Sequence, residues 1–428
     1  MIKQFRDPRL SLWQSAIDES VVSANQIELE KSATASAVFN RPDERDPLIR
    51  DTVKFCAALD QDVPEQELEK GALQVVGRCS NLAFKAAGTF VKNLVMGHPF
   101  DENKARDELR EKFGSCDSRY ANAAVLYAKF LASGSQVPYR RHKELSDFVI
   151  EDLPERGQIG VVADWGTGQV EARTVLQQIA KKAPSVVVHL GDIYYAGTAF
   201  EVENYFFRPW RSILAPSGNP RTFSLAGNHD MYSGGAPYYD LLDKLSQPAS
   251  YFCLRNRYWQ IIAMDTGLNA KFGVDPTSLE RTEVEWLVDK IVNRGDRKTI
   301  LLSHHQLFSA DEKFEGQSFN IPLYKQIVSV LGNVDLWLWG HEHNLVVYEP
   351  YMNLRRGRCI GCGAFPVGKE ELPSVHVNAD VPLKGVSLGE HGDFYQHGYA
   401  IIKLDGPTAS AAYFQDGDEQ NPLYEETL

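Results

Sequence analysis

The chain has 428 residues, of which 43% are hydrophobic, and a formal net charge of −12 at pH 7. This length and composition suffice for a large core and predict two domains. The acidic balance argues against a nucleic-acid partner, because a phosphate backbone selects basic surfaces. No apolar run approaches the roughly 18 residues of a membrane-spanning helix, and the opening MIKQFRDPRLSLWQ lacks signal-peptide character. We therefore expect a cytoplasmic protein without a transmembrane segment.

The first third of the chain has a helical pattern. Apolar residues recur at three- and four-residue steps over residues 68–96, and a further helix is expected over 101–133. Residues 134–157 are rich in charge and contain Pro and Gly, which is typical of a linker. We therefore predict an all-helical N-terminal domain with its linker over residues 1–150, followed by a second domain over 151–428.

The helical segment has no evident catalytic motif. Its small residues, such as Gly71 and Gly77, suit close helix packing and would also suit a membrane-surface or pore-forming helix. Arg78 and Lys85 interrupt the stretch, which favours packing. Residues 1–133 are a candidate contact surface for a partner or an oligomer.

From residue 158 onward the pattern changes to that of an α/β fold. Short β-branched runs alternate with helical or irregular segments, as expected for sheets that are buried on both faces. Five of these runs end in oxygen- or imidazole-bearing residues: Asp164, Asp192, Asn228-His229-Asp230, His304-His305 and His341-Glu342-His343. Ligands of α/β sheets gather at the carboxyl ends of strands, so the five sets are expected to converge.

Each of these motifs alone has a plainer explanation. DWGTG at 164–168 is a weak match to a phosphate-binding loop, because it lacks the P-loop lysine and the full dinucleotide pattern. Asn228-His229-Asp230 is compatible with a polar turn, and His304 with a buried structural histidine. On an extended backbone, however, His341 and His343 point to one side, which suits two neighbouring metal ions. The joint occurrence after five strands favours a metal site.

Taken together, the motifs resemble those of the calcineurin-like metallophosphoesterases and, within them, the purple acid phosphatases. The matching motifs are Asp164-x-Gly166, Gly191-Asp192-x-x-Tyr195, Gly227-Asn228-His229-Asp230, His304 and Gly340-His341-x-His343. Most members of the superfamily have Asp-x-His in the first motif. Purple acid phosphatases have glycine there and a tyrosine three residues after the second aspartate, and the chain has both changes. The resemblance covers residues 158–428 and implies an α/β fold with a four-layer αββα sandwich.

The resemblance also implies a dinuclear metal centre, with Fe(III) at metal 1 and Fe(II), Zn(II) or Mn(II) at metal 2. The implied ligands are Asp164, Tyr195 and His343 for metal 1, Asn228, His304 and His341 for metal 2, and Asp192 as the bridge. Anionic oxygens suit a hard trivalent ion, whereas imidazoles suit a borderline divalent one. A tyrosinate would offset the extra positive charge of Fe(III).

The resemblance further assigns roles around the metals. Within GDIYYAG at 191–197 it makes Tyr195 the ligand, by its spacing from Asp192, and leaves Tyr194 as a packing residue. A metal-bound hydroxide would attack phosphorus, and His229 would contact the phosphate or protonate the leaving oxygen. His305 is expected to point away from the ligands and to support them.

The chain departs from the purple acid phosphatase pattern at one position near the expected substrate. Purple acid phosphatases usually have a further histidine shortly after the fourth motif, and QLFSADEKFEGQS at 306–318 has none. Glu312, Lys313 or Glu315 are the candidates for that role, and His397 is a further candidate that is at least as well explained as structural.

These residues point first to a phosphomonoesterase of the acid phosphatase type, with a small phosphoester as substrate and His229 and Asp192 as catalytic residues. A phosphodiesterase with the same metal site is the close alternative. A third possibility is an effector that binds a partner or a membrane, whose helical domain is regulated by the phosphoesterase domain. All seven ligand positions are filled, which argues against complete loss of activity.

Overall fold

The computed structural model describes residues 133–428, apart from 272–275, 370–371, 373–375 and 393, together with residues 123, 126, 127, 130 and 131. The predicted N-terminal helical domain, and any partner or membrane contact that it makes, lies almost wholly outside the described residues. Within the part of the chain that is described, no helix combines the length and the apolar character needed to cross a membrane.

A six-stranded mixed sheet carries the first three predicted strand ends. Its order is β15-β14-β13-β2-β3-β4, with β2 (Arg156–Val162), β3 (Val186–His189), β4 (Arg221–Ser224), β13 (Gly398–Asp405), β14 (Thr408–Gln415) and β15 (Tyr424–Thr427). The strands β2, β3 and β4 are parallel, with Ile159 beside Val186. Their carboxyl ends therefore lie at the same edge of the sheet.

A seven-stranded sheet carries the other two strand ends. Its order is β1-β5-β6-β7-β8-β10-β9, with β1 (Val149–Ile150), β5 (Phe252–Arg255), β6 (Trp259–Ala263), β7 (Lys298–Leu302), β8 (Leu336–Trp339), β9 (Leu345–Val347) and β10 (Gly357–Ile360). The neighbouring strands β6, β7, β8 and β10 are parallel. This places the residues after β7 and β8 side by side.

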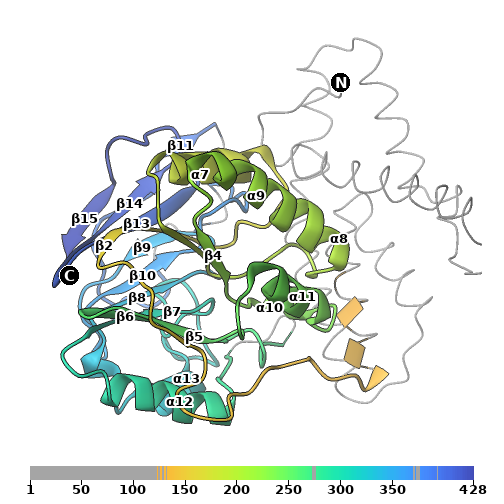
Figure 1. Ribbon diagram of the computed structural model, residues 1–428. Coiled ribbons are helices and arrows are strands. Elements are labelled where there is room, and N and C mark those ends of the chain that lie inside the picture. Colours follow the sequence, from red (N-terminus) through yellow and green to blue (C-terminus); the bar gives the residue numbers. More distant parts are fainter. Residues whose placement is uncertain are drawn as a thin grey trace, which may run out of the picture. The chain divides into compact units, whose positions relative to one another are not determined.

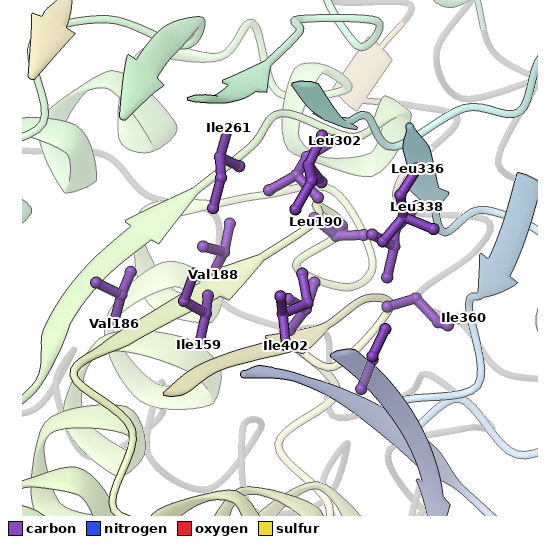
Figure 2. Packing of buried hydrophobic residues seen from close by; sticks show 14 of the residues in the cluster. Ile159, Val186, Val188, Leu190, Ile261, Leu302, Leu336, Leu338, Ile360 and Ile402 are labelled. Atoms are coloured by element: carbon purple, nitrogen blue, oxygen red, sulfur yellow. The ribbon is translucent and has the colours of Figure 1, made fainter. Parts of the chain in front are cut away.

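The two sheets face each other across a shared apolar core. Figure 2 shows Leu190, which follows β3, near Leu302 and Leu338 of the other sheet, and Val188 of β3 belongs to the same cluster. Helices α7 (Val170–Lys181) and α9 (Arg208–Leu214) cover the outer face of the six-stranded sheet. Helices α12 (Arg281–Val292) and α13 (Ile321–Ile327) cover the outer face of the seven-stranded sheet (Figure 1). The four-layer αββα sandwich predicted from the sequence is confirmed.

The remaining elements complete the described chain. They are α8 (Ala199–Glu201), the π-helix η1 (Val202–Phe207), the 3₁₀ helices η2 (Ala215–Ser217) and η3 (Leu331–Asn333), α10 (Asn228–Met231), α11 (Ala236–Leu245), β11 (Glu390–His391) and β12 (Phe394–Tyr395). The loops around α8 and α10 contribute directly to the site.

The stretch predicted as a linker is part of the sandwich unit. Its strand β1 pairs in parallel with β5. The Tyr139 hydroxyl donates to Glu283 Oε2 over 2.8 Å, and Trp286 Nε1 donates to the carbonyl of Asp147 over 2.9 Å. The compact unit extends back to Leu126, N-terminal to the boundary predicted at 150/151. Composition suggested a linker because the few apolar residues of this stretch are scattered among charged ones.

The inter-sheet core generates a stability prediction. Leu302 is fully buried between the sheets, whereas Leu145 is 44% exposed. We expect Leu302→Ala to lower the free energy of unfolding by about 2–5 kcal/mol, because it removes buried methyl groups and leaves a cavity. Leu145→Ala, the matched control, is expected to change it by less than about 0.5 kcal/mol. Urea denaturation followed by tryptophan fluorescence measures both, and equal losses would contradict the described core.

Candidate metal centre

Five strand ends from the two sheets meet at one site. Asp164 follows β2, Asp192 follows β3, and Asn228 opens α10 after β4; these come from the six-stranded sheet. His304 follows β7 and His341 follows β8, from the seven-stranded sheet. Asp164, Asp192 and His304 offer ligand atoms that all lie within 4.8 Å of one another. The sandwich thus brings carboxylates from one sheet against imidazoles from the other.

The backbone turns sharply at three of these residues. Asp164, Asp192 and His341 have positive φ angles of 55°, 73° and 68°. Residues other than glycine rarely adopt this left-handed conformation, which costs about 1–3 kcal/mol at each position and concentrates at functional sites. The turns end each strand abruptly and direct the side chains toward the same space.

One half of the site is a triangle of three ligand-type atoms. Asn228 Oδ1 lies 3.1 Å from both His304 Nε2 and His341 Nδ1, and the two ring nitrogens lie 3.3 Å apart. Ligands at about 2.1 Å from a metal ion are about 3.0 Å apart at right angles and about 3.4 Å apart in a tetrahedron. The triangle therefore has the dimensions of a metal-binding face, and its donor set suits a borderline divalent ion.

The other half of the site contains a phenol. The Tyr194 hydroxyl lies 2.7 Å from Asp164 Oδ1 and 2.8 Å from His343 Nε2. His343 Nε2 and Asp164 Oδ1 are 3.5 Å apart. A carboxylate, a phenol and an imidazole thus form a second triangle, whose two oxygen donors suit a harder ion.

The phenol at this position is that of Tyr194, whereas the sequence assigned the position to Tyr195 and gave Tyr194 a packing role. Tyr195 meets the site through its main chain. Its carbonyl lies 2.7 Å from His229 Nδ1, and its amide donates to Glu201 Oε1. These two main-chain contacts fix the backbone at Tyr195, so the preceding residue reaches Asp164.

Asp192 lies between the two halves. Its Oδ2 is 3.3 Å from His304 Nε2 and 3.9 Å from His229 Nε2, and its Oδ1 accepts from the His229 amide over 3.0 Å. Burial alone would raise the pKa of Asp192, but His304 and His229 hold it well below its usual range. An ionised carboxylate in this position is suited to bridging two cations.

His305 also lies at the site, contrary to the expectation that it points away. His304, His305 and His341 form a group whose ligand atoms all lie within 4.8 Å of one another. The His305 ring centroid is 4.4 Å from that of His341, and its Nδ1 lies 3.0 Å from Thr266 Oγ1. Strand alternation fails as a guide here because β7 ends at Leu302, before the two histidines.

Two further carboxylates, Asp230 and Glu201, hold the loops that carry the ligands. The sequence motif contains Asp230 without a role for it, and Glu201 was not singled out. Asp230 accepts from the amides of Asp192, Ile193 and Gly227 over 2.8–3.2 Å. Burial, followed by the charge of Asp192, raises the pKa of Asp230 to about 8. The three hydrogen bonds of this carboxyl fix the loop after β3 relative to α10.

Glu201 holds the other end of the same loop. Its carboxylate accepts from the amides of Tyr195, Ala196 and Thr198 and from the Thr198 hydroxyl. Thr198 and Glu201 form the capping box of α8. The T-x-x-E spacing of a capping box is visible in the sequence and was the available signal.

The histidines differ in their electrostatic surroundings. Burial would lower the pKa of His304, but the neighbouring Asp192 raises it. Burial lowers the pKa of His229, and the opposing effect of Asp192 does not offset this. His229 is thus biased toward the neutral imidazole, with Nδ1 beside the Tyr195 carbonyl.

The chain lacks the histidine that purple acid phosphatases usually have shortly after the fourth motif. The residues considered for its role differ in burial and contacts. Glu312 is half-buried and accepts from Gln306 Nε2 over 2.6 Å, whereas Lys313 and Glu315 are exposed. His397 is buried, and burial lowers its pKa. Of the three residues in the 306–318 stretch, Glu312 is the one tied to the loop after His304.

Comparison with a family model agrees with this fold. Residues 157–345 match the model of the calcineurin-like phosphoesterase family. A 3′,5′-cyclic adenosine monophosphate phosphodiesterase of Escherichia coli, CpdA, is 31% identical over 121 residues, which cover 28% of this chain and 42% of that protein. The chain therefore matches less than half the length of this curated relative.

Two solved structures are distantly similar to this chain. The purple acid phosphatase PPD1 of yellow lupin is 13% identical, with a TM-score of 0.47, over 65% of this chain and 55% of that chain. The Plasmodium GAP50 protein, the anchor in the inner membrane complex, is 15% identical, with a TM-score of 0.46, over 63% of this chain and 88% of that chain.

Proposed function

We propose that the protein is a dinuclear-metal phosphatase that hydrolyses phosphomonoesters. The observation that carries the proposal is the pair of ligand triangles on either side of Asp192, in a domain of the phosphoesterase family. The donor atoms converge from both sheets, and the two carboxylates among them are buried. Buried carboxylates without compensating charge are costly, so bound cations account for the arrangement better than an empty polar cluster does.

The two halves of the site favour different metals. Asn228, His304 and His341 would hold Fe(II), Zn(II) or Mn(II), because imidazole nitrogens suit such ions. Asp164, Tyr194 and His343 would hold Fe(III), whose additional charge a tyrosinate would offset. Asp192 would bridge the two. Tyr194 replaces Tyr195 in this ligand set because its hydroxyl is the one beside Asp164 and His343.

When bound, two such ions neutralise charge on the phosphoryl oxygens and activate water as the nucleophile near neutral pH. The remaining steps depend on side chains of the chain itself. His229 lies with Nε2 on the Asp192 side, within reach of a phosphoester held beside the bridge. Its Nδ1 contact to the Tyr195 carbonyl orients the ring, so that Nε2 is the atom available to contact the phosphate or hand a proton to the leaving oxygen.

A phosphodiesterase is the second candidate, favoured by one observation. The curated relative with 31% identity is a cyclic-nucleotide phosphodiesterase, and its match falls on part of this chain only. The same ligand set would serve either substrate class, since the bound ions would supply the same charge neutralisation and the same activated water to both reactions.

A pair of substrates with the same leaving group separates these candidates. We expect 4-nitrophenyl phosphate to be hydrolysed with a higher kcat/KM than bis(4-nitrophenyl) phosphate. Treatment with a chelator should abolish both activities, and added Fe, Zn or Mn should restore them. His304→Ala should reduce both by more than roughly a hundredfold. His391→Ala, an exposed histidine on β11, is the matched control and should change neither. Faster diester hydrolysis would favour the second candidate, and metal-independent activity would contradict both.

The identity of the phenol ligand is tested by removing each hydroxyl in turn. We expect Tyr194→Phe to lose metal from the Asp164 side, together with any visible tyrosinate-to-Fe(III) absorption band. Tyr195→Phe should retain both, because its main-chain contacts do not use the hydroxyl. Metal content per chain and the visible spectrum measure the effect. Loss of the band in Tyr195→Phe alone would return the ligand role to Tyr195.

The role of His229 is tested by varying the leaving group. If His229 supplies a proton, His229→Ala should slow an alkyl phosphate by about 10²–10⁴-fold and 4-nitrophenyl phosphate much less, because nitrophenolate leaves without protonation. Steady-state kcat/KM values for the two substrates give the comparison. Equal losses on both would indicate phosphate binding rather than proton donation.

A further inference from the structure

Among the seven proposed ligands, Asn228 is the one whose donor atom depends on the orientation of an amide. Its carbonyl oxygen is a ligand for a cation, whereas its NH2 group is not. In the structure Oδ1 faces the ring nitrogens of His304 and His341, at 3.1 Å from each. Rotation of the carboxamide by half a turn would replace that oxygen with N–H groups and remove a ligand.

The other end of the carboxamide meets the hydroxyl of Tyr232. Asn228 Nδ2 donates to Tyr232 Oη over 2.6 Å. Tyr232 follows α10 directly, four residues after Asn228, and four-residue spacing in a helical turn places two side chains next to each other. The Tyr232 hydroxyl therefore accepts the N–H group at the atom opposite the proposed metal-binding oxygen.

The Tyr232 ring is itself held from two sides. It is buried, and its centroid lies 4.9 Å from the His229 ring and 5.6 Å from the Tyr127 ring, which meets it edge-on. Aromatic contacts of this kind stabilise the buried ring in its position. The hydroxyl is thus kept in place by packing as well as by its hydrogen bond.

Tyr127 belongs to a segment that covers the loop after α10. A Cβ atom at Gly234 would lie 2.7 Å from the Phe130 ring, and one at Gly235 would lie 3.0 Å from Val137. Both glycines have positive φ angles, 95° and 74°. The loop is therefore closely packed against Phe130 and Val137, and Tyr127 contacts Tyr232.

We propose that Tyr232 is a positioning residue for metal binding, whose hydroxyl fixes the Asn228 carboxamide with its oxygen toward His304 and His341, and that Tyr127 holds the Tyr232 ring in place. The proposal rests on the proposed dinuclear function. It makes the segment that leads into the N-terminal third a contributor to the metal centre, because its Tyr127 contacts the residue that orients a ligand.

Metal affinity tests this proposal without using catalytic activity. The full chain, stripped with a chelator, is titrated with Zn(II) against a chromophoric competitor to give the Kd of each bound equivalent. The equivalent that is lost in His304→Ala identifies the Asn228 side. For that equivalent we expect Tyr232→Phe to raise Kd by about 10–100-fold, the usual effect of removing a group that orients a ligand. Excess Zn(II) should restore occupancy.

Tyr238→Phe is the matched control. Tyr238 is fully buried on α11 and donates to the Ser224 carbonyl over 2.8 Å, so its variant also loses one buried hydroxyl but none that touches a proposed ligand. We expect its Zn(II) affinity to stay at the wild-type value, although its unfolding free energy falls. Equal Kd shifts in both tyrosine variants, or no shift in Tyr232→Phe, would overturn the positioning role.

Tyr127→Leu tests the second half of the proposal. It keeps an apolar side chain but removes the edge-on ring contact, and we expect a smaller rise in the same Kd. An unchanged Kd would remove Tyr127 from the proposal. If the wild-type chain does not bind Zn(II), Mn(II) or Fe at the Asn228 side, the proposed function itself is overturned. If it binds metal there but the tyrosine variants do not change Kd, only the positioning role is overturned.

Discussion

Two buried carboxylates, Asp164 and Asp192, set the conditions for the rest of the site. Both are at most 1% exposed, and they lie in the same cluster as His304. Removing such groups from water costs several kcal/mol each unless opposite charge compensates them. The imidazoles of the facing sheet provide part of that compensation, and bound cations would provide the remainder. The sandwich holds the carboxylates in place because each follows a strand of a buried parallel set.

The loops around the site are held mainly through their backbone amides. Asp230 and Glu201 each accept several N–H groups from the stretch that begins at Asp192, so that stretch is fixed from both ends. Residues with positive φ end the strands, and amide-binding carboxylates hold the turns that follow. The positions of Asp192 and Tyr194 therefore depend on side chains that make no contact with the proposed metals. Tyr232 is a further side chain of this kind, because it is not a proposed ligand and its hydroxyl accepts a hydrogen bond from Asn228.

The α/β class was predictable from the sequence because the strands are short, β-branched and buried on both faces, whereas the four-layer sandwich was implied by the family resemblance. The convergence of Asp164 and Asp192 followed from one rule, that the carboxyl ends of parallel strands share an edge. His304 reaches them from the facing sheet, an arrangement that the family resemblance implied. The choice between Tyr194 and Tyr195 did not follow, since it depends on the turn at Asp192 and on main-chain contacts of Tyr195. Neither the turn nor these contacts can be recognised from a pattern of residues in the sequence. The position of His305 was missed for a related reason, because it lies beyond the last paired residue of β7.

The central claim is that two metal ions bind on either side of Asp192. Anomalous X-ray diffraction from crystals of the full chain, recorded at the iron and zinc absorption edges, tests it most directly. We expect two peaks, one bounded by Asp164, Tyr194 and His343 and the other by Asn228, His304 and His341. A single peak, or two peaks that leave either of these sets without a metal, would contradict it.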